Sequence, residues 1–371
     1  MIRCRHLHDL SENPMSTRPR PTIAGRRILP GALLVVLLAA SGGASPGVPH
    51  DTDPVARETP TEAAVPVKGM TISCPGAGQI WGSDAMVETM RTLKDLGLNW
   101  VAIHPYAGIR STGQVPLRDE WYGDSTEWLT RPIEEAHKLG LKIMIKPHIA
   151  YWGSPFSWRG EIDFTTDEQW GVFFNSYTAW IKRVAELSKD ADAFVVGTEL
   201  DRTVRFEDEW RGIIRDVRAI TDAPLTYSAN WDSYRRVGFW DALDVIGVQS
   251  YFPLVRHDNV PTEAELTKGW TRVLGELDRY SKRHNRKVVF AELGYNRSAR
   301  AALEPWDYRT GGAGAEEVQR RCLDCALRAI EGNETVVGAF LWKWFPGERA
   351  RGNFIKSTPV MRKVIGSRWG E

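Results

Sequence analysis

Cysteine is scarce in this chain of 371 residues, with four copies at positions 4, 74, 322 and 325. Cys322 and Cys325 have the CxxC spacing, but no second CxxC and no nearby pair of histidines accompany them. A zinc site would need such additional ligands, and the pair lies inside a helical pattern over 316–330. We therefore predict no metal or redox site, and expect either a local disulfide or two buried thiols.

An excess of charge of one sign is also missing. The chain has 48 Lys and Arg against 47 Asp and Glu, for a net charge of +1, which gives no reason to expect nucleic acid or an anionic membrane as a partner. The apolar run over 28–40 is shorter than the roughly 20 residues of a membrane span. No glycine-rich phosphate loop follows the first predicted strand, which argues against a nucleotide-binding sheet.

The amino-terminal segment has the pattern of an export signal. Arg18, Arg20, Arg26 and Arg27 precede the apolar run, and the small residues 41–45 follow it, as in secretory signals. We predict a signal peptide and basic leader over 1–45 and a disordered linker over 46–66, rich in Pro, Thr, Ala and acidic residues. The mature chain is then exported, either periplasmic or secreted, and is expected to be monomeric and without a membrane span.

From residue 67 to residue 371, strand and helix patterns alternate without a break in composition. The predicted strands are 69–73, 100–104, 142–146, 193–199, 225–229, 245–248, 288–292 and 336–344. The predicted helices are 83–96, 126–139, 166–188, 206–220, 239–243, 262–284, 315–330 and 357–365. Such alternation predicts a parallel sheet, and eight units in about 300 residues fit a single-domain (β/α)₈ barrel.

Polar and aromatic side chains stand at the carboxyl ends of nearly all these strands. They are His104, Lys146, His148, Glu199, Asn230, Tyr251, Glu292 and Trp342. In a (β/α)₈ barrel these ends meet on one face, where active sites are built. Glu199 and Glu292 are three βα units apart, so we expect them to face each other across the barrel mouth.

Two facing carboxylates in a chain with 16 Trp predict glycoside hydrolysis, which needs no cofactor. One carboxyl donates a proton to the leaving oxygen, and the other attacks the sugar if the two lie about 5 to 5.5 Å apart, with retention of configuration. We predict Glu292 as nucleophile, Glu199 as acid/base and Tyr251 as a hydrogen-bond donor to Glu292. Sugar binding is predicted for His104, Lys146, His148, Trp152, Asn230, Trp231, Tyr251 and Trp342, while Asp201 is expected to be a solvated loop acid.

Several segments resemble a known family. The sequences at 69–71, 146–148, 196–200, 227–231 and 291–295 are similar to those of glycoside hydrolase family 113, within the clan A retaining glycosidases. The resemblance implies Glu199 as acid/base, Glu292 as nucleophile, and a β-mannan or related β-1,4-glycan as substrate. Many clan A enzymes have Asn before the acid/base residue, where this chain has Thr198; Asn230 is the candidate to contact the sugar 2-hydroxyl instead.

Two other classes compete with this interpretation. A non-catalytic carbohydrate-binding or cell-envelope protein on the same barrel would keep the tryptophans but lose one carboxylate. A metal-dependent barrel hydrolase would need several His and Asp at strand ends, often as HxH near the first strand, where this chain has Ser73-Cys74-Pro75. The presence of both glutamates favours a glycosidase.

Overall fold

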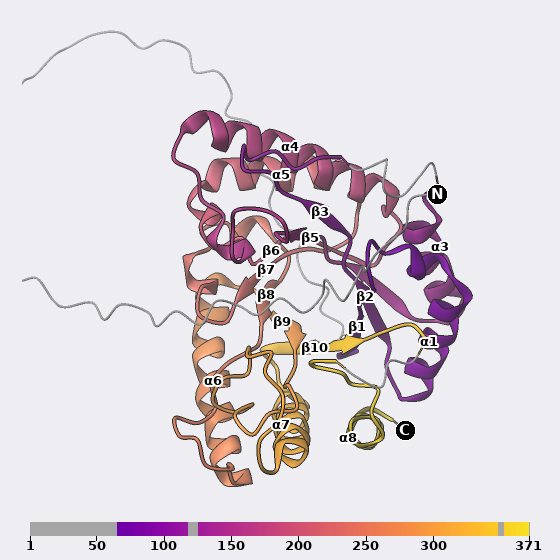
Figure 1. Cartoon of the computed structure of the whole chain (residues 1–371), viewed down its shortest axis with the longest axis vertical. Coiled ribbons are helices and arrows are strands. Elements are labelled where there is room, and N and C mark those ends of the chain that lie inside the picture. Colours follow the sequence, from indigo (N-terminus) through magenta and orange to yellow (C-terminus); the bar gives the residue numbers. More distant parts are fainter. Residues whose placement is uncertain (1–64, 118–124, 348–351, 371) are drawn as a thin grey trace, which may run out of the picture.

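The computed structural model describes residues 65–117, 125–347 and 352–370. The predicted signal peptide and all but the last two residues of the predicted linker lie outside these ranges. Eight parallel strands form a closed barrel in which β10 pairs with β1 (Figure 1). They are β1 (Val67–Ile72), β2 (Trp100–Ile103), β4 (Lys142–Ile145), β6 (Ala193–Thr198), β7 (Leu225–Asn230), β8 (Ile246–Gln249), β9 (Val288–Leu293) and β10 (Val336–Trp344). The predicted (β/α)₈ barrel is thus confirmed.

The helices lie around the barrel (Figure 1). They are α1 (Asp84–Asp95), α3 (Glu127–Lys138), α4 (Asp167–Leu187), α5 (Glu207–Arg218), α6 (Glu263–His284), α7 (Ala315–Ile330) and α8 (Pro359–Trp369). A capping box begins α6: the Thr262 hydroxyl accepts from the Glu265 amide, and the Glu265 carboxylate accepts from the Thr262 amide. The short helix predicted after the fifth strand is a 3₁₀ turn over Trp240–Ala242.

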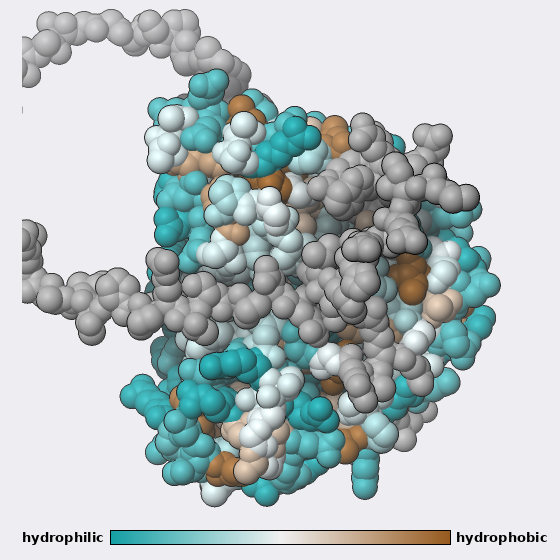
Figure 2. All heavy atoms as spheres, viewed as in Figure 1, coloured by the Kyte–Doolittle hydropathy of each residue, from teal (hydrophilic) through white to brown (hydrophobic). Residues whose placement is uncertain are grey.

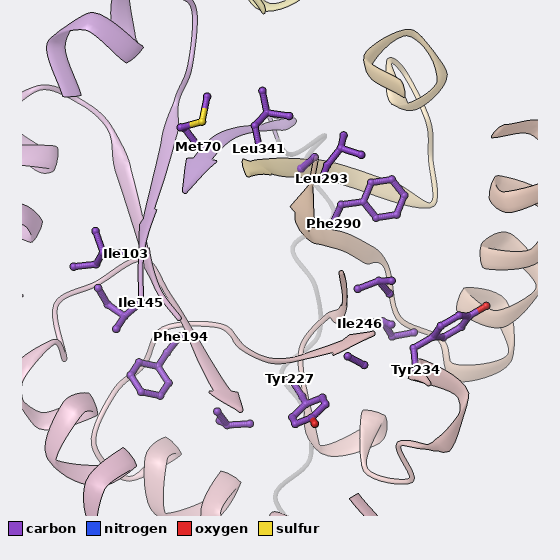
Figure 3. Packing of buried hydrophobic residues seen from close by; sticks show 14 of the residues in the cluster. Met70, Ile103, Ile145, Phe194, Tyr227, Tyr234, Ile246, Phe290, Leu293 and Leu341 are labelled. Atoms are coloured by element: carbon purple, nitrogen blue, oxygen red, sulfur yellow. The ribbon is translucent and has the colours of Figure 1, made fainter. Parts of the chain in front are cut away.

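The alternation of side chains along the strands separates two apolar layers. Ala102, Met144, Val195, Val289 and Phe340 form a small cluster of their own, as expected for side chains that point into the barrel. A far larger cluster lies between strands and helices and includes the residues labelled in Figure 3, such as Ile103, Ile145 and Phe194. Gly69 is required in β1 because a Cβ there would run into the Phe340 ring.

Apolar side chains lie scattered among hydrophilic ones on the face shown in Figure 2. The exposed large apolar residues of the described part are Val65, Leu117, Val172 and Val260. No helix in the described ranges is both long and apolar enough to cross a membrane. Cys322 and Cys325 are buried free thiols, so the thiol form is the one present.

A second, two-stranded parallel sheet lies beyond the ends of β2 and β4. It is formed by β3 (Tyr106–Gly108) and β5 (His148–Ala150). These residues lie outside the strands predicted from the sequence, because three-residue strands are too short to show a period. The small sheet matters for function because it carries Tyr106 and His148 on a hydrogen-bonded support.

Candidate active site

Glu292 is held by two donors from neighbouring strands. It lies near the end of β9 and is only 4% exposed. Lys146, which follows β4, donates from Nζ to Oε1 at 2.6 Å, and the Tyr251 hydroxyl donates to Oε2 at 2.7 Å. The predicted contact between Tyr251 and Glu292 is thus present. Lys146 is fully buried and also donates to the Ala291 carbonyl at 3.2 Å, so its ammonium group is hydrogen-bonded to the strand that carries Glu292.

Glu199 reaches the barrel mouth by a local distortion of the chain. The register of β6 against β7 shifts between Val195 and Thr198, and Glu199 follows with a φ of +56°. A left-handed backbone is uncommon for a residue other than glycine, and such residues cluster at functional sites. The Glu199 amide still donates to the Ser228 carbonyl at 2.9 Å, which fixes the turn. Its carboxylate accepts from Arg159 Nη1 at 3.1 Å.

The two glutamates have different surroundings. Burial raises the pKa of Glu199 to about 7, the negative charges of Glu292 and Asp201 act in the same direction, and Arg159 and Lys146 oppose them. Near neutral pH, Glu199 can therefore hold a proton and also give it up. Glu292 instead has a buried ammonium group against one oxygen. One carboxyl is thus placed to exchange a proton while the other is paired with a cation.

His104 and His148 stack on each other with ring centroids 5.1 Å apart, and Trp342 lies 6.1 Å from His148. Burial lowers the pKa of both histidines well below the ordinary value, and nearby cations, Arg159 and Lys146 among them, lower it further. Both rings are therefore neutral at physiological pH. Within the described part of the chain, neither nitrogen of His104 has a hydrogen-bond partner, although the residue is fully buried.

The predicted aromatic contacts lie in different parts of the site. Trp342 covers the Lys146 ammonium, which is 4.9 Å from its ring centroid. Trp152 packs against Tyr106 of the small sheet, with centroids 5.3 Å apart. Trp231 stacks on Trp306 at 5.3 Å with an angle of 14° between the planes. Trp231 thus stands in a loop after β7, where it contacts other aromatic rings than Trp152 and Trp342 do.

Asn230 is hydrogen-bonded to Asp201, the residue that was predicted to be a solvated loop acid. Its side-chain amide donates to Asp201 Oδ1 at 3.1 Å, and the Ser233 hydroxyl donates to the same oxygen at 2.9 Å. The expectation that Asp201 is solvated is wrong, because the residue is partly buried and burial raises its pKa to about 6. A sugar contact by Asn230 stays a prediction.

Residues outside the predicted set also lie at or near the site. Arg159 lies in the 3₁₀ helix η2 (Arg159–Glu161) between β5 and α4 and contacts Glu199 directly. Tyr308 lies in the connection between β9 and α7, and the charges of both glutamates act on its hydroxyl. Gln249 ends β8, a position that could have been selected from the sequence; no described residue bonds its amide. No group of three or more His, Cys, Asp or Glu within the described ranges could hold a metal ion.

A closed (β/α)₈ barrel with glutamates at the ends of its fourth and seventh strands is the arrangement of a clan A glycoside hydrolase. Residues 70–352 match Glycoside Hydrolase Family 113, and the chain belongs to that family. The protein is therefore a glycoside hydrolase. A comparison with curated protein sequences finds no match.

Solved structures agree with the family. The GH113 beta-mannanase AaManA from Alicyclobacillus acidocaldarius, in complex with ManMIm, is 26% identical, with a TM-score of 0.71 over 83% of this chain and 98% of that one. A GH113 beta-1,4-mannanase is 22% identical, with a TM-score of 0.71 over 82% and 99%. The beta-glucuronidase of Ruminococcus gnavus is 18% identical, with a TM-score of 0.54 over 82% and 50%. The last two support the fold.

Proposed function

We propose that this glycoside hydrolase cleaves β-1,4-linked mannan or manno-oligosaccharides with retention of configuration. The proposal is carried by the pair of buried glutamates at the barrel mouth, one with a pKa near 7 and one paired with a lysine. The substrate class is supported by the 26% identity to a protein described as a beta-mannanase. A non-catalytic carbohydrate-binding protein is not favoured, because both carboxylates are present and both lie among buried polar partners.

In the first step, Glu199 donates its proton to the glycosidic oxygen while Glu292 attacks the anomeric carbon. The glycosidic bond breaks and an ester forms between Glu292 and the sugar. In the second step, Glu199 takes a proton from water, the water oxygen attacks the anomeric carbon, and the Glu292 carboxylate leaves. Lys146 and Tyr251 stabilise the negative charge of Glu292 before attack and again as it departs.

Sugar binding falls to the aromatic and polar residues around this pair. Trp342, which stacks with His148 and lies close to Lys146, forms the platform under the ring at the cleavage point. His104 and His148 bind sugar hydroxyls, as does Asn230. Trp152 and Trp231, on separate loops, contact sugars farther along the chain.

Export is part of the same proposal. The basic residues, the apolar run over 28–40 and the small residues after it direct the protein to the periplasm or the medium, where it acts as a monomer on a polysaccharide. Comparing the location of the full chain with that of a form lacking residues 1–45 tests the signal. Size-exclusion chromatography with light scattering tests the oligomeric state.

The central experiment is hydrolysis of a panel of β-glycans by the purified protein, beside Glu199→Gln, Glu292→Gln and the exposed control Glu186→Gln. We expect release of manno-oligosaccharides by the wild type and the control, and loss of turnover in the two active-site variants. NMR of the first product should show the β-anomer. Release from another glycan would change the substrate, and wild-type rates with Glu292→Gln would refute the catalytic pair.

A further inference from the structure

Arg159 is fixed over the barrel mouth by the backbone of its own loop. Its Nε donates to the Ile149 carbonyl of β5 at 3.1 Å, and the Glu161 amide donates to the Trp158 carbonyl at 3.0 Å to close the 3₁₀ turn. The residue is only 7% exposed. A buried guanidinium in a loop needs hydrogen-bond acceptors, and besides the Ile149 carbonyl the acceptors of Arg159 are two side chains of the candidate active site, His148 and Glu199.

One nitrogen of Arg159 serves two acceptors. Nη1 lies 3.0 Å from His148 Nδ1 and 3.1 Å from Glu199 Oε2. Because a guanidinium only donates hydrogen bonds, Nδ1 must accept, and the neutral His148 ring carries its proton on Nε2. That nitrogen lies 4.0 Å from Glu292 Oε1. Arg159 therefore touches one glutamate and fixes the tautomer of the histidine that faces the other.

We propose that Arg159 is a positioning residue of this glycosidase, which fixes the Glu199 carboxyl and the His148 tautomer together and prepares Glu199 to act as base in the second step. The inference rests on the proposed double-displacement mechanism. Once Glu292 is esterified its negative charge is gone, while the Arg159 charge remains. The change favours ionised Glu199 at the moment when water must be deprotonated.

Several charged and titratable groups face Glu199, and the effect of Arg159 has to be measured against them. They are Tyr151 from the β5–α4 connection, Lys146 after β4, Asp201 after β6, Tyr227 on β7, Tyr251 after β8, Glu292 on β9 and Tyr308 from the β9–α7 connection. Among the two cations near Glu199, only Arg159 forms a hydrogen bond with it; Lys146 is bonded to Glu292.

The test compares Arg159→Gln with Arg205→Gln, a control whose side chain is half exposed and paired with Asp163. The probe is a 2,4-dinitrophenyl β-glycoside of whichever sugar the wild type releases from the glycan panel. Its leaving group needs no proton, so the first step does not depend on Glu199. In Arg159→Gln we expect the burst of dinitrophenolate to persist and steady-state turnover to fall about 10- to 100-fold, as for loss of a charged hydrogen bond.

Azide separates positioning from structural damage, because it attacks the glycosyl-enzyme without a base. It should restore turnover of Arg159→Gln several-fold and leave the control unchanged. On a natural oligosaccharide, the alkaline limb of kcat/KM should move to higher pH in Arg159→Gln. Arg159→Lys keeps the positive charge but not the planar guanidinium group, so its turnover should lie between those of the wild type and Arg159→Gln. Unchanged turnover, or a burst that falls together with turnover and no azide effect, would overturn the proposal.

A measurement on the wild type tests the proposed role of Arg159 even if Arg159→Gln does not fold or no glycan is cleaved. Nitrogen-15 NMR of the His148 ring, assigned by comparison with His148→Gln, should show an unprotonated Nδ1 and a protonated Nε2 at neutral pH. Protonation at Nδ1 would refute the role of Arg159. Absence of glycan cleavage with the expected tautomer would instead refute the proposed substrate reaction.

Discussion

The ion pair between Lys146 and Glu292 yields a quantitative prediction about stability. The two side chains are 0% and 5% exposed, with Nζ and Oε1 2.6 Å apart, so solvent screens them little. Removing one partner of a buried pair leaves an uncompensated charge, at a cost of about 3–5 kcal/mol. We expect Lys146→Met to lower the free energy of unfolding by that amount, and Glu292→Gln to lower it as well by leaving the ammonium group without its carboxylate.

The double variant is predicted to lose less free energy of unfolding than the two single variants lose in sum. Lys146→Met/Glu292→Gln removes both charges together, so we expect a coupling energy of about 2–3 kcal/mol, within the range for contacting residues. Urea unfolding followed by fluorescence and circular dichroism together gives the four free energies, and coincident transitions establish two-state behaviour. Lys138→Met/Glu135→Gln is the control: that pair is 2.8 Å apart, close to the 2.6 Å of the buried pair, but lies on the surface, where no measurable coupling is expected.

Additive effects at the buried pair, within about 0.5 kcal/mol, would refute the reasoning. They would mean that Lys146 is held mainly by the Ala291 carbonyl and by the face of Trp342. Activity gives an independent measure. Lys146→Met should lower kcat by about 10²- to 10³-fold, as when one preorganised donor to a reacting oxygen is removed.

Three further predictions concern other parts of the molecule. Because burial raises the pKa of Glu199 to about 7, kcat/KM on oligosaccharides should fall tenfold per pH unit above about 7. An alkaline fall in kcat/KM that already begins below pH 6 would contradict this. Cys322 and Cys325, both buried and free, should react with a thiol reagent only after unfolding. Gly97→Ala should lower the free energy of unfolding by about 2 kcal/mol more than Gly140→Ala does. Both glycines have a positive φ, but only at Gly97 would the added Cβ collide with backbone atoms, those of Trp369.

The barrel could be predicted from the sequence because each of its strands and helices has a pattern within its own segment of the chain. Each strand is a short apolar run, each helix has its own period, and the polar residue after a strand marks the active face. Glu199 and Glu292 were predicted on this basis, and the contact from Tyr251 followed from strand order. Register in a closed barrel then places neighbouring strand ends together.

What could not be predicted depends on contacts between loops. The three-residue strands that carry Tyr106 and His148 have no period, and they pair only because β2 and β4 already lie side by side. Arg159 is one charged residue in a long loop, and nothing in its neighbourhood distinguishes it from surface arginines. Asp201 was taken as solvated for the same reason, because its partners Asn230 and Ser233 come from a different strand end.

The two glutamates are therefore positioned by different kinds of structure. Glu292 lies within β9, and Lys146 and Tyr251 at the ends of β4 and β8 hold its oxygens, so the barrel itself fixes the proposed nucleophile. Glu199 lies one residue beyond β6, on a left-handed turn, and its carboxyl is bonded by Arg159 from a loop. Substitution of Arg159 in the β5–α4 loop should then change the pKa of Glu199, the proposed acid/base, and leave Glu292 in place. Substitutions in that loop are therefore one route to another pH dependence, beside changes at Asp201 or Lys146, whose charges also act on Glu199.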